Sequence, residues 1–301
     1  MTTGIAEAGM PGALATALKG EIVYFGEVFA PKSEVSVSPD DRGFLLGDGI
    51  YEVAVSYNGK FVALDRHMDR LRRSLGEARI DPSVADPLET VFQELLDRNG
   101  FGSSGKAMVY LQVTRGVAPR SHAFPKGAVK PTVYAYAAAV PRDVDDLAAG
   151  TFAITRPDLR WSRCDIKVIS LMANVLANQE AKENGAFEAV LIRDGLVLEG
   201  THTSFFGVRG GVVHTAPISN LILPGITREI VIEAALRDGI EVVEAALPAT
   251  ELPSLDEMFL TGTTTEVVPI LRLDGRPVSN GMPGELTLRI ADLYRAAAGI
   301  A

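Results

Sequence analysis

The stretch 189-AVLIRDGLVLE-199 decides how the second half of this chain folds, because two short apolar runs flank one tight turn. Ala189–Ile192 and Leu196–Glu199 are rich in aliphatic residues, which suit a pleated, partly buried surface. Asp194-Gly195 between them is a strong signal for a two-residue hairpin. We therefore expect a pair of antiparallel strands here, inside a region built of short strands.

The neighbouring sequence adds further strands and helices around that hairpin. Phe205–Val208 and Val212–Thr215 flank a glycine-rich turn, and helices are expected over Leu171–Asn184 and Thr227–Asp238. Many short strands with two or three helices predict a barrel-like α+β domain over residues 147–301.

Residues 20–139 are expected to form a smaller α+β unit. Asp65 is placed to cap one helix, and Asp86-Pro87 to open a second one. The polar, proline-containing segment 140–146 is the best domain boundary, and residues 1–19 are interpreted as an N-terminal extension. The strand-like runs of this unit are Glu21–Phe29, Gly49–Tyr57, Lys60–Leu64, Ala107–Thr114 and Pro131–Ala139. Asn58-Gly59 predicts a hairpin turn between the second and the third of these runs.

Composition and charge exclude several classes of protein. The chain is 47% hydrophobic and 22% charged, which is ordinary for a globular protein and excludes a disordered one. Its net charge of −9 makes nucleic acid and anionic membranes poor candidate partners. No apolar run reaches the ~18 residues of a membrane span, and the start lacks the basic segment of a signal peptide. A single cysteine, Cys164, forms no internal disulfide, so we expect a soluble cytoplasmic protein.

Two side chains at strand-like segments are candidates for chemistry. Lys167 lies in the apolar run Cys164–Ile169, where partial burial would lower the pKa of its ammonium and free the amine as a nucleophile. A lysine on a half-exposed strand is the more frequent arrangement on spacing alone. Glu199 ends the hairpin beside Gly200, where a carboxylate either points into a cleft or lies at a solvated turn. Neither residue identifies a site by itself.

Two further segments have the character of an anion site. Leu223–Glu229 leads into an apolar-faced helix, whose free N–H groups and dipole attract anions, and Thr227 adds a hydroxyl. Thr261–Thr265 adds hydroxyls and amides around Gly262. Each segment alone reads as a capped helix or a polar turn. Together they suggest a phosphate cup, for which Arg70 on an earlier helix is a candidate counter-charge.

A proline-bracketed loop, Ala118–Pro125, presents Arg120 and His122 two residues apart. The planar guanidinium fork and one further imidazole donor suit a carboxylate, while incidental surface charge is the alternative. Metal binding is not expected, because the four histidines show no ligand-like spacing and there are no paired cysteines. The chain also lacks the Gly-x-Ser-x-Gly elbow of a serine hydrolase.

Taken together, these segments resemble the fold-type-IV pyridoxal-phosphate enzymes, which include branched-chain and D-amino-acid aminotransferases and aminodeoxychorismate lyase. The resemblance runs from about Glu21 to the last helix, with the segments in the family order. It implies an α+β, two-domain fold with a smaller N-terminal α/β sandwich domain and a larger C-terminal pseudo-barrel α/β domain. The segments that carry it are Asp41–Glu52, Cys164–Lys167, Asn174–Ala177, Glu199-Gly200, Pro224–Arg228 and Thr261–Glu266.

Within the family, Val113–Pro125 and Arg160–Lys167 look most like the D-amino-acid aminotransferases. The resemblance implies that Tyr51, Arg120 and His122 bind the substrate carboxylate. The loop with the last two residues would come from the neighbouring subunit of a homodimer, with the active site at the interface. One departure lies at 201–203, Thr-His-Thr, where those enzymes carry small serines near the cofactor.

The resemblance also implies the roles of the remaining residues. Lys167 would form the Schiff base with pyridoxal 5′-phosphate and shuttle the proton, Glu199 would pair with the pyridine nitrogen, and Leu223 would pack on the ring. A D-amino acid, of the D-alanine or D-glutamate type, would give its amino group to 2-oxoglutarate or pyruvate in a ping-pong cycle. The implied phosphate ligands are Arg70, the main chain of Ile226, Thr227 and Thr263.

Other functions use the same fold. A branched-chain L-amino-acid aminotransferase is the first alternative, followed by an (R)-amine transaminase and an aminodeoxychorismate lyase. A cofactor-binding protein without turnover is a further alternative, against which the presence of Lys167, Glu199 and Arg70 argues. Solvent exposure of Arg120 and His122 would favour the branched-chain class.

Overall fold

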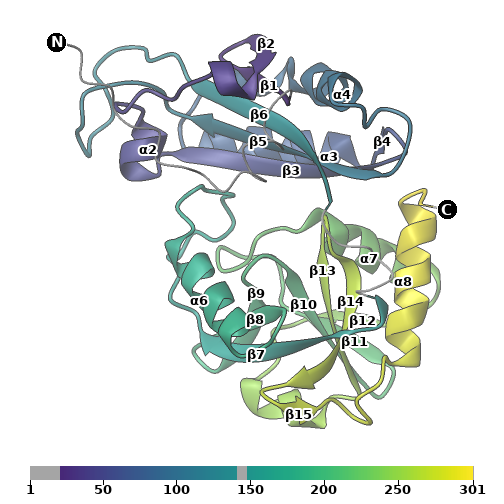
Figure 1. The fold of residues 1–301 in the computed structure, drawn as a ribbon. Helices are drawn as coiled ribbons and strands as arrows, with labels where there is room; N and C mark the ends of the chain where they lie inside the picture. The colour runs from purple at the N-terminus through teal and green to yellow at the C-terminus, as the bar shows by residue number, and fades with distance from the viewer. Residues whose placement is uncertain (1–20, 141–147, 301) are drawn as a thin grey trace.

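The computed structural model describes residues 21–140 and 148–300, which form two β-sheets (Figure 1). The first sheet has six strands in the order β2-β1-β6-β5-β3-β4, and the second has nine. The first sheet ends with β6 at Ala139 and the second begins with β7 at Thr151, on either side of the boundary predicted at 140–146. The exact bounds of the two domains stay a prediction. The expected extension, 1–19, and most of the expected linker, 141–146, lie outside the described residues.

The first sheet is antiparallel throughout and carries the helices α3, Leu64–Glu77, and α4, Leu88–Arg98, on one face. Alternate residues of β5, such as Val109 and Leu111, pack in one core with Leu71 of α3 and Phe92 of α4. The opposite face is half-buried and rich in tyrosine. The elements are β1 Ile22–Phe25, β2 Val28–Pro31, η1 Lys32–Glu34, α2 Arg42–Leu46, β3 Gly49–Tyr57, β4 Lys60–Phe61, α3 Leu64–Glu77, η2 Pro82–Ala85, α4 Leu88–Arg98, β5 Lys106–Thr114 and β6 Thr132–Ala139.

The second sheet closes on itself, so the predicted barrel is confirmed. Six strands follow one another in the order β10-β13-β14-β7-β8-β9, and the pair Glu199–Ser204 joins β9 back to β10. The ring strands are β7 Thr151–Pro157, β8 Glu188–Arg193, β9 Leu196–Gly200, β10 Ser204–Arg209, β13 Glu257–Gly262 and β14 Glu266–Leu273. The other elements are α6 Met172–Glu183, β11 Val212–Thr215, α7 Ile226–Arg237, β12 Val242–Glu244, η3 Ala249–Ser254, β15 Arg276–Pro277 and α8 Glu285–Ala297.

The barrel strands pack on both of their faces. Phe205 and Leu260 belong to one apolar cluster, while Phe206 and Phe259 pack with Ile230 and its neighbours on α7 and α8. Figure 1 shows these two helices on the same side of the barrel. Among the described residues, no helix is long and apolar enough to cross a membrane.

The hairpin turns predicted at Asn58-Gly59 and Asp194-Gly195 are confirmed, and four local expectations are wrong. Glu21–Phe29 is not one strand, because Gly26 and Glu27, at φ +57° and +85°, turn the chain into the β1–β2 hairpin. The strand expected over Lys60–Leu64 ends at Phe61, and α3 begins at Leu64, so Asp65 lies in the first turn of the helix and does not cap it. The Lys167 segment is irregular, and in the described part of the chain it pairs with the first sheet through one isolated bridge between Ile50 and Val168.

Candidate active site

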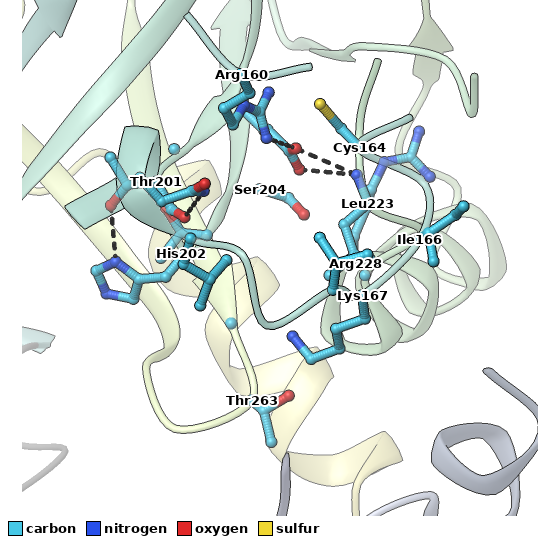
Figure 2. A pocket seen from close by; sticks show the side chains of 18 of the residues that line it. Arg160, Cys164, Ile166, Lys167, Thr201, His202, Ser204, Leu223, Arg228 and Thr263 are labelled. Carbon is cyan, nitrogen blue, oxygen red and sulfur yellow. Dashed lines mark hydrogen bonds and ion pairs between the residues drawn. The ribbon is translucent and has the colours of Figure 1, made fainter. Parts of the chain in front are cut away.

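A cavity of about 340 Å³ lies where the two sheets meet (Figure 2). Its walls come from β3 and α3 on one side, and from the β9–β10 turn, the start of α7 and the β13–β14 turn on the other. The cavity brings together residues that are far apart in the sequence. The expected site residues that line it are Tyr51, Arg70, Lys167, Glu199, Leu223, Ile226, Thr227 and Thr263.

Lys167 is held by its main chain, which leaves its amine in the cavity. Its carbonyl accepts a hydrogen bond of 2.9 Å from the Tyr51 N–H, and the adjacent Val168 bridges to Ile50 of β3. The amine lies 4.1 Å from the centre of the Tyr51 ring. In the described part of the chain no carboxylate is paired with it, so this amine is available to a ligand.

Glu199 is a buried carboxylate at the seam of the barrel. Arg160 donates to it through Nη1, and the Leu223 N–H donates to Oε2 over 3.1 Å (Figure 2). Burial raises the pKa of Glu199 to about 7, although Arg160 and the Leu223 N–H favour its charged form. Arg160 is in turn fixed by the buried Asp158, at 2.9 Å from Nε. Glu199 therefore ends in the cavity with its orientation set from two sides.

The start of α7 forms the anion end of the cavity. Gly225 precedes the helix and no side chain caps it, so the first N–H groups are open to a ligand. A Cβ on Gly225 would lie 2.8 Å from Ser204 Oγ, which leaves no room for a side chain there. Thr261 Oγ1, buried beside this end, has no hydrogen-bond partner among the described residues.

Arg70 is aimed at α7 by a buried glutamate that the sequence analysis did not single out. Glu52 accepts from Arg70 Nη2 at 2.6 Å and from Nε at 3.0 Å, and lies 3.0 Å from His67 Nδ1. The remaining nitrogen, Nη1, donates to the Pro224 carbonyl just before α7. Burial opposes ionisation, but Arg70 and His67 hold the pKa of Glu52 well below its usual value. Burial also lowers the pKa of His67.

A second buried glutamate, Glu188 of β8, holds the turn that departs from the family pattern. Thr201 and Thr203 donate to it through Oγ1 at 2.5 and 2.9 Å, and His202 Nδ1 lies at 3.0 Å. Burial opposes ionisation, yet His202 and the two hydroxyls lower the pKa of Glu188 to about 2. The His202 ring packs edge-on against Phe187, with its side chain half exposed at the wall of the cavity.

Arg120 and His122 do not lie in this cavity. Both side chains are exposed on the loop between β5 and β6. One chain therefore brings the amine, the buried carboxylate and the anion cradle together, but not the guanidinium and the imidazole expected to bind a substrate carboxylate.

Comparison with known proteins identifies the family. The model of the amino-transferase class IV family matches residues 49–273. The chain is 42% identical to D-alanine aminotransferase of Bacillus licheniformis, over 89% of this chain and 94% of that protein. It is 37% identical to the D-alanine aminotransferase of Staphylococcus haemolyticus, over 90% and 95% of the two chains.

Solved structures of aminotransferases share the fold of this chain. The branched-chain amino acid aminotransferase of Escherichia coli superposes with a TM-score of 0.84 at 25% identity, over 90% of this chain and 92% of that one. The branched-chain enzyme of T.th., solved with pyridoxamine 5′-phosphate, gives 0.83 at 27%, over 94% and 96%. The chain belongs to the class IV aminotransferases, which share fold type IV and depend on pyridoxal phosphate.

The residues of the cavity fit this cofactor. The unpaired amine of Lys167 suits its aldehyde, and the buried carboxylate of Glu199 suits its ring nitrogen. The uncapped start of α7 and the partnerless Thr261 hydroxyl leave donors that a phosphate would satisfy.

Proposed function

We propose that this protein transfers the amino group of a D-amino acid, of the D-alanine or D-glutamate type, to a 2-oxo acid such as 2-oxoglutarate or pyruvate. One observation carries the proposal: a single cavity combines the Lys167 amine, the buried Glu199 and an open helix start. Its likeness to D-alanine aminotransferases, at 36–42% identity over about 90% of the chain, supports the choice of donor.

The cofactor would be held at three points. Arg70, the Ile226 N–H and Thr227 would bind the phosphate, and Thr263 would add a hydroxyl from the opposite wall. Leu223 would pack against the ring, while Glu199 would keep the pyridine nitrogen protonated, since a carboxylate beside it stabilises the cation.

Lys167 would carry the reaction. Its Nζ would bind the cofactor's aldehyde and, once released, would take the proton from the substrate Cα and return one to the product. Bound pyridoxal phosphate would supply the electron sink that stabilises negative charge at Cα. Tyr51, whose ring lies 4.1 Å from this amine, is in position to limit where a substrate can lie.

The substrate carboxylate would be bound by Tyr51 together with Arg120 and His122 of a neighbouring subunit. Arg120 and His122 are exposed and lie outside the cavity of their own chain, which is consistent with their binding a substrate in the cavity of another copy. Exposed apolar residues near the cavity support a homodimer as well, because a soluble protein rarely leaves such a patch uncovered. These residues are Leu159, Trp161, Met172, Val175 and Leu176, with exposed fractions of 83%, 51%, 71%, 57% and 58%.

We propose that this activity belongs to the cytoplasm, and the cysteine content supports this location. The single cysteine, Cys164, is buried and unpaired, as suits a reducing compartment.

A branched-chain L-amino-acid aminotransferase is the second candidate. The superposition on two such enzymes, at TM-scores of 0.84 and 0.83, favours it, and so does the exposure of Arg120 and His122 in the single chain. That function would bind the substrate carboxylate without Arg120 and His122 and would leave their loop without a role in binding.

The visible spectrum of the cofactor-loaded protein separates the two candidates. D-alanine and L-leucine are added in separate cuvettes. We expect D-alanine alone to replace the absorbance of the bound aldehyde form by that of the amine form. Conversion by L-leucine alone would overturn the D-specific proposal and favour the branched-chain class.

A further inference from the structure

We propose that Asp48, Arg42 and Arg115 form a brace that fixes the loop carrying Arg120 and His122, and that this brace sets the affinity for the substrate carboxylate. The inference rests on the proposed function, because that function gives the loop its role. The three residues act through the loop, so they are positioning residues and touch neither substrate nor cofactor.

One carboxylate organises the brace. Asp48 Oδ2 accepts from Arg42 Nε and from Arg115 Nε, both at 2.8 Å, and Oδ1 accepts from Arg115 Nη2 at 3.0 Å. Arg42 and Arg115 are 2% and 8% exposed. Burial opposes the ionisation of Asp48, but Arg115 and Arg42 hold its pKa below the usual value. The brace therefore stays charged, with two buried cations around one anion.

The remaining donors and faces of the two arginines reach the loop. Arg42 Nη1 donates to the Ser121 carbonyl over 2.7 Å, and this residue stands between Arg120 and His122. The Arg115 guanidinium lies 3.8 Å from the centre of the Phe124 ring, two residues further on. The two arginines therefore contact the loop at Ser121, between Arg120 and His122, and again at Phe124.

Main-chain contacts fix the start of the same loop. Val117 forms a bridge with Asp41, and the Ala118 N–H donates to the Asp40 carbonyl over 3.2 Å. Arg115 also donates to the carbonyls of Ala78 and Arg79 at the end of α3. The loop is therefore tied to the helix that carries Arg70.

Preorganisation connects this brace to binding. Ordering a free loop costs conformational entropy for each residue fixed, so a loop already in place binds a carboxylate at lower cost. Release of either arginine would let the exposed Arg120 and His122 side chains sample many positions.

The test compares variants of the cofactor-loaded protein with D-alanine as donor. Arg42→Met keeps an unbranched apolar stem and removes the donors of the side chain. We expect KM for D-alanine to rise about tenfold, as for loss of one well-placed charge-assisted contact, with kcat within about twofold. Amide exchange over residues 117–125 should accelerate, and the cofactor's visible absorbance should be unchanged. Asp48→Asn should act in the same direction, and Arg42→Lys should restore part of the affinity.

Two control variants in the same loop separate this inference from the proposed function. Lys126→Gln, exposed and outside the brace, should leave KM and exchange as in the wild type. Arg120→Gln tests the carboxylate site itself. A raised KM for Arg120→Gln beside an unchanged KM for Arg42→Met would overturn the brace alone. An unchanged KM for Arg120→Gln would overturn the proposed function, and with it the effect of the brace on affinity. Loss of cofactor from Arg42→Met and Arg42→Lys alike would also overturn the inference, because it would reveal a general structural role.

Discussion

The cavity and the β5–β6 loop differ in how much one chain completes. In the cavity, residues from both sheets meet, and two of the charged groups already have a partner that orients them, Glu52 for Arg70 and Arg160 for Glu199. On the loop, Arg120 and His122 face solvent although their main chain is firmly held. Under the proposed function, the groups expected to hold the cofactor come from a single chain, whereas Arg120 and His122 would bind the substrate only in a second copy of the chain.

The largest expected effect is at Lys167. Lys167→Ala removes the amine that would bind the cofactor and move the proton, so kcat should fall by about 10²–10⁴-fold or more. The measurement is single-turnover conversion of D-alanine, with the cofactor's absorbance recorded after gel filtration. Lys60→Ala, an exposed lysine on β4, is the matched control and should retain both. Full turnover by Lys167→Ala would show that the Lys167 amine does not carry the reaction.

Glu52→Gln tests the partner that orients Arg70 within the cavity. It leaves a buried guanidinium without its counter-charge, so the free energy of unfolding should fall by about 3–5 kcal/mol. The lowered pKa of Glu52 means that its stabilisation is present above the ordinary carboxyl pKa and is lost as the pH falls below it. In urea unfolding at several pH values from about 3 to about 7, the free energy of unfolding should depend less on pH in the variant than in the wild type. Glu241→Gln, at an exposed residue, is the control and should keep the dependence of the wild type. The same dependence in Glu52→Gln would contradict the role of Glu52 as the counter-charge of Arg70.

Arg120→Gln tests the loop side of the comparison. Loss of a charge-assisted hydrogen bond to the carboxylate, about 1.5–3 kcal/mol, should raise KM for D-alanine roughly 10–100-fold. Cofactor binding should not change, because Arg120 lies outside its own cavity. Steady-state kinetics beside a cofactor titration gives both quantities, and a parallel loss of cofactor would contradict the division between the two regions.

Glu199 provides a pH test of the cavity alone. Because burial raises its pKa to about 7, the contribution of Glu199 to the stability of the cofactor-free fold should be complete below the ordinary carboxyl pKa and should be lost as the pH rises through 7. The loss should be on the order of 1–3 kcal/mol. Glu199→Gln should flatten this dependence in thermal or urea unfolding of the cofactor-free protein, and a slope equal to the wild type would refute the raised pKa.

The smallest effect is expected where the two sheets meet outside the cavity. Arg66 of α3 pairs with Glu233 of α7 at 2.9 Å, with both side chains about one third exposed. Arg66→Gln should lower the free energy of unfolding by about 0.2–1 kcal/mol, as for partly exposed ion pairs. Arg72→Gln, whose nearest partner Asp69 lies on the same helix, is the control. A large loss on Arg66→Gln alone would show that this contact helps to hold the cavity together.

Local turn chemistry explains which parts of the fold the sequence predicts. Asp194-Gly195 and Asn58-Gly59 both adopt positive φ, as a two-residue hairpin turn requires, so both hairpins were predictable. The β1–β2 turn was not, because Glu27 adopts φ +85° without a residue type that signals it. The apolar run around Lys167 is equally misleading, since its shape is set by contacts with β3 and not by pairing along its length.

The site divides along similar lines. The residues expected to touch the cofactor could be read from segments that resemble the family, and the structure gathers them in one cavity. Their supporting partners could not, because Glu52 and Glu188 look like ordinary strand residues until the fold places them against Arg70 and His202. Arg120 and His122 are a third case, because their expected site lies in a neighbouring subunit, whose position the sequence of one chain does not give.

The barrel is joined at one place by a single residue pair, and that pair includes Glu199. The other neighbouring strands of the ring pair over three or more residues, so the junction of β9 with β10 has the shortest pairing in the ring. A ligand that contacts both Glu199 of β9 and Ser204 of β10 in the cavity would join the two strands across this junction. Binding of the cofactor would then also make the barrel more rigid at the place where the proposed chemistry occurs.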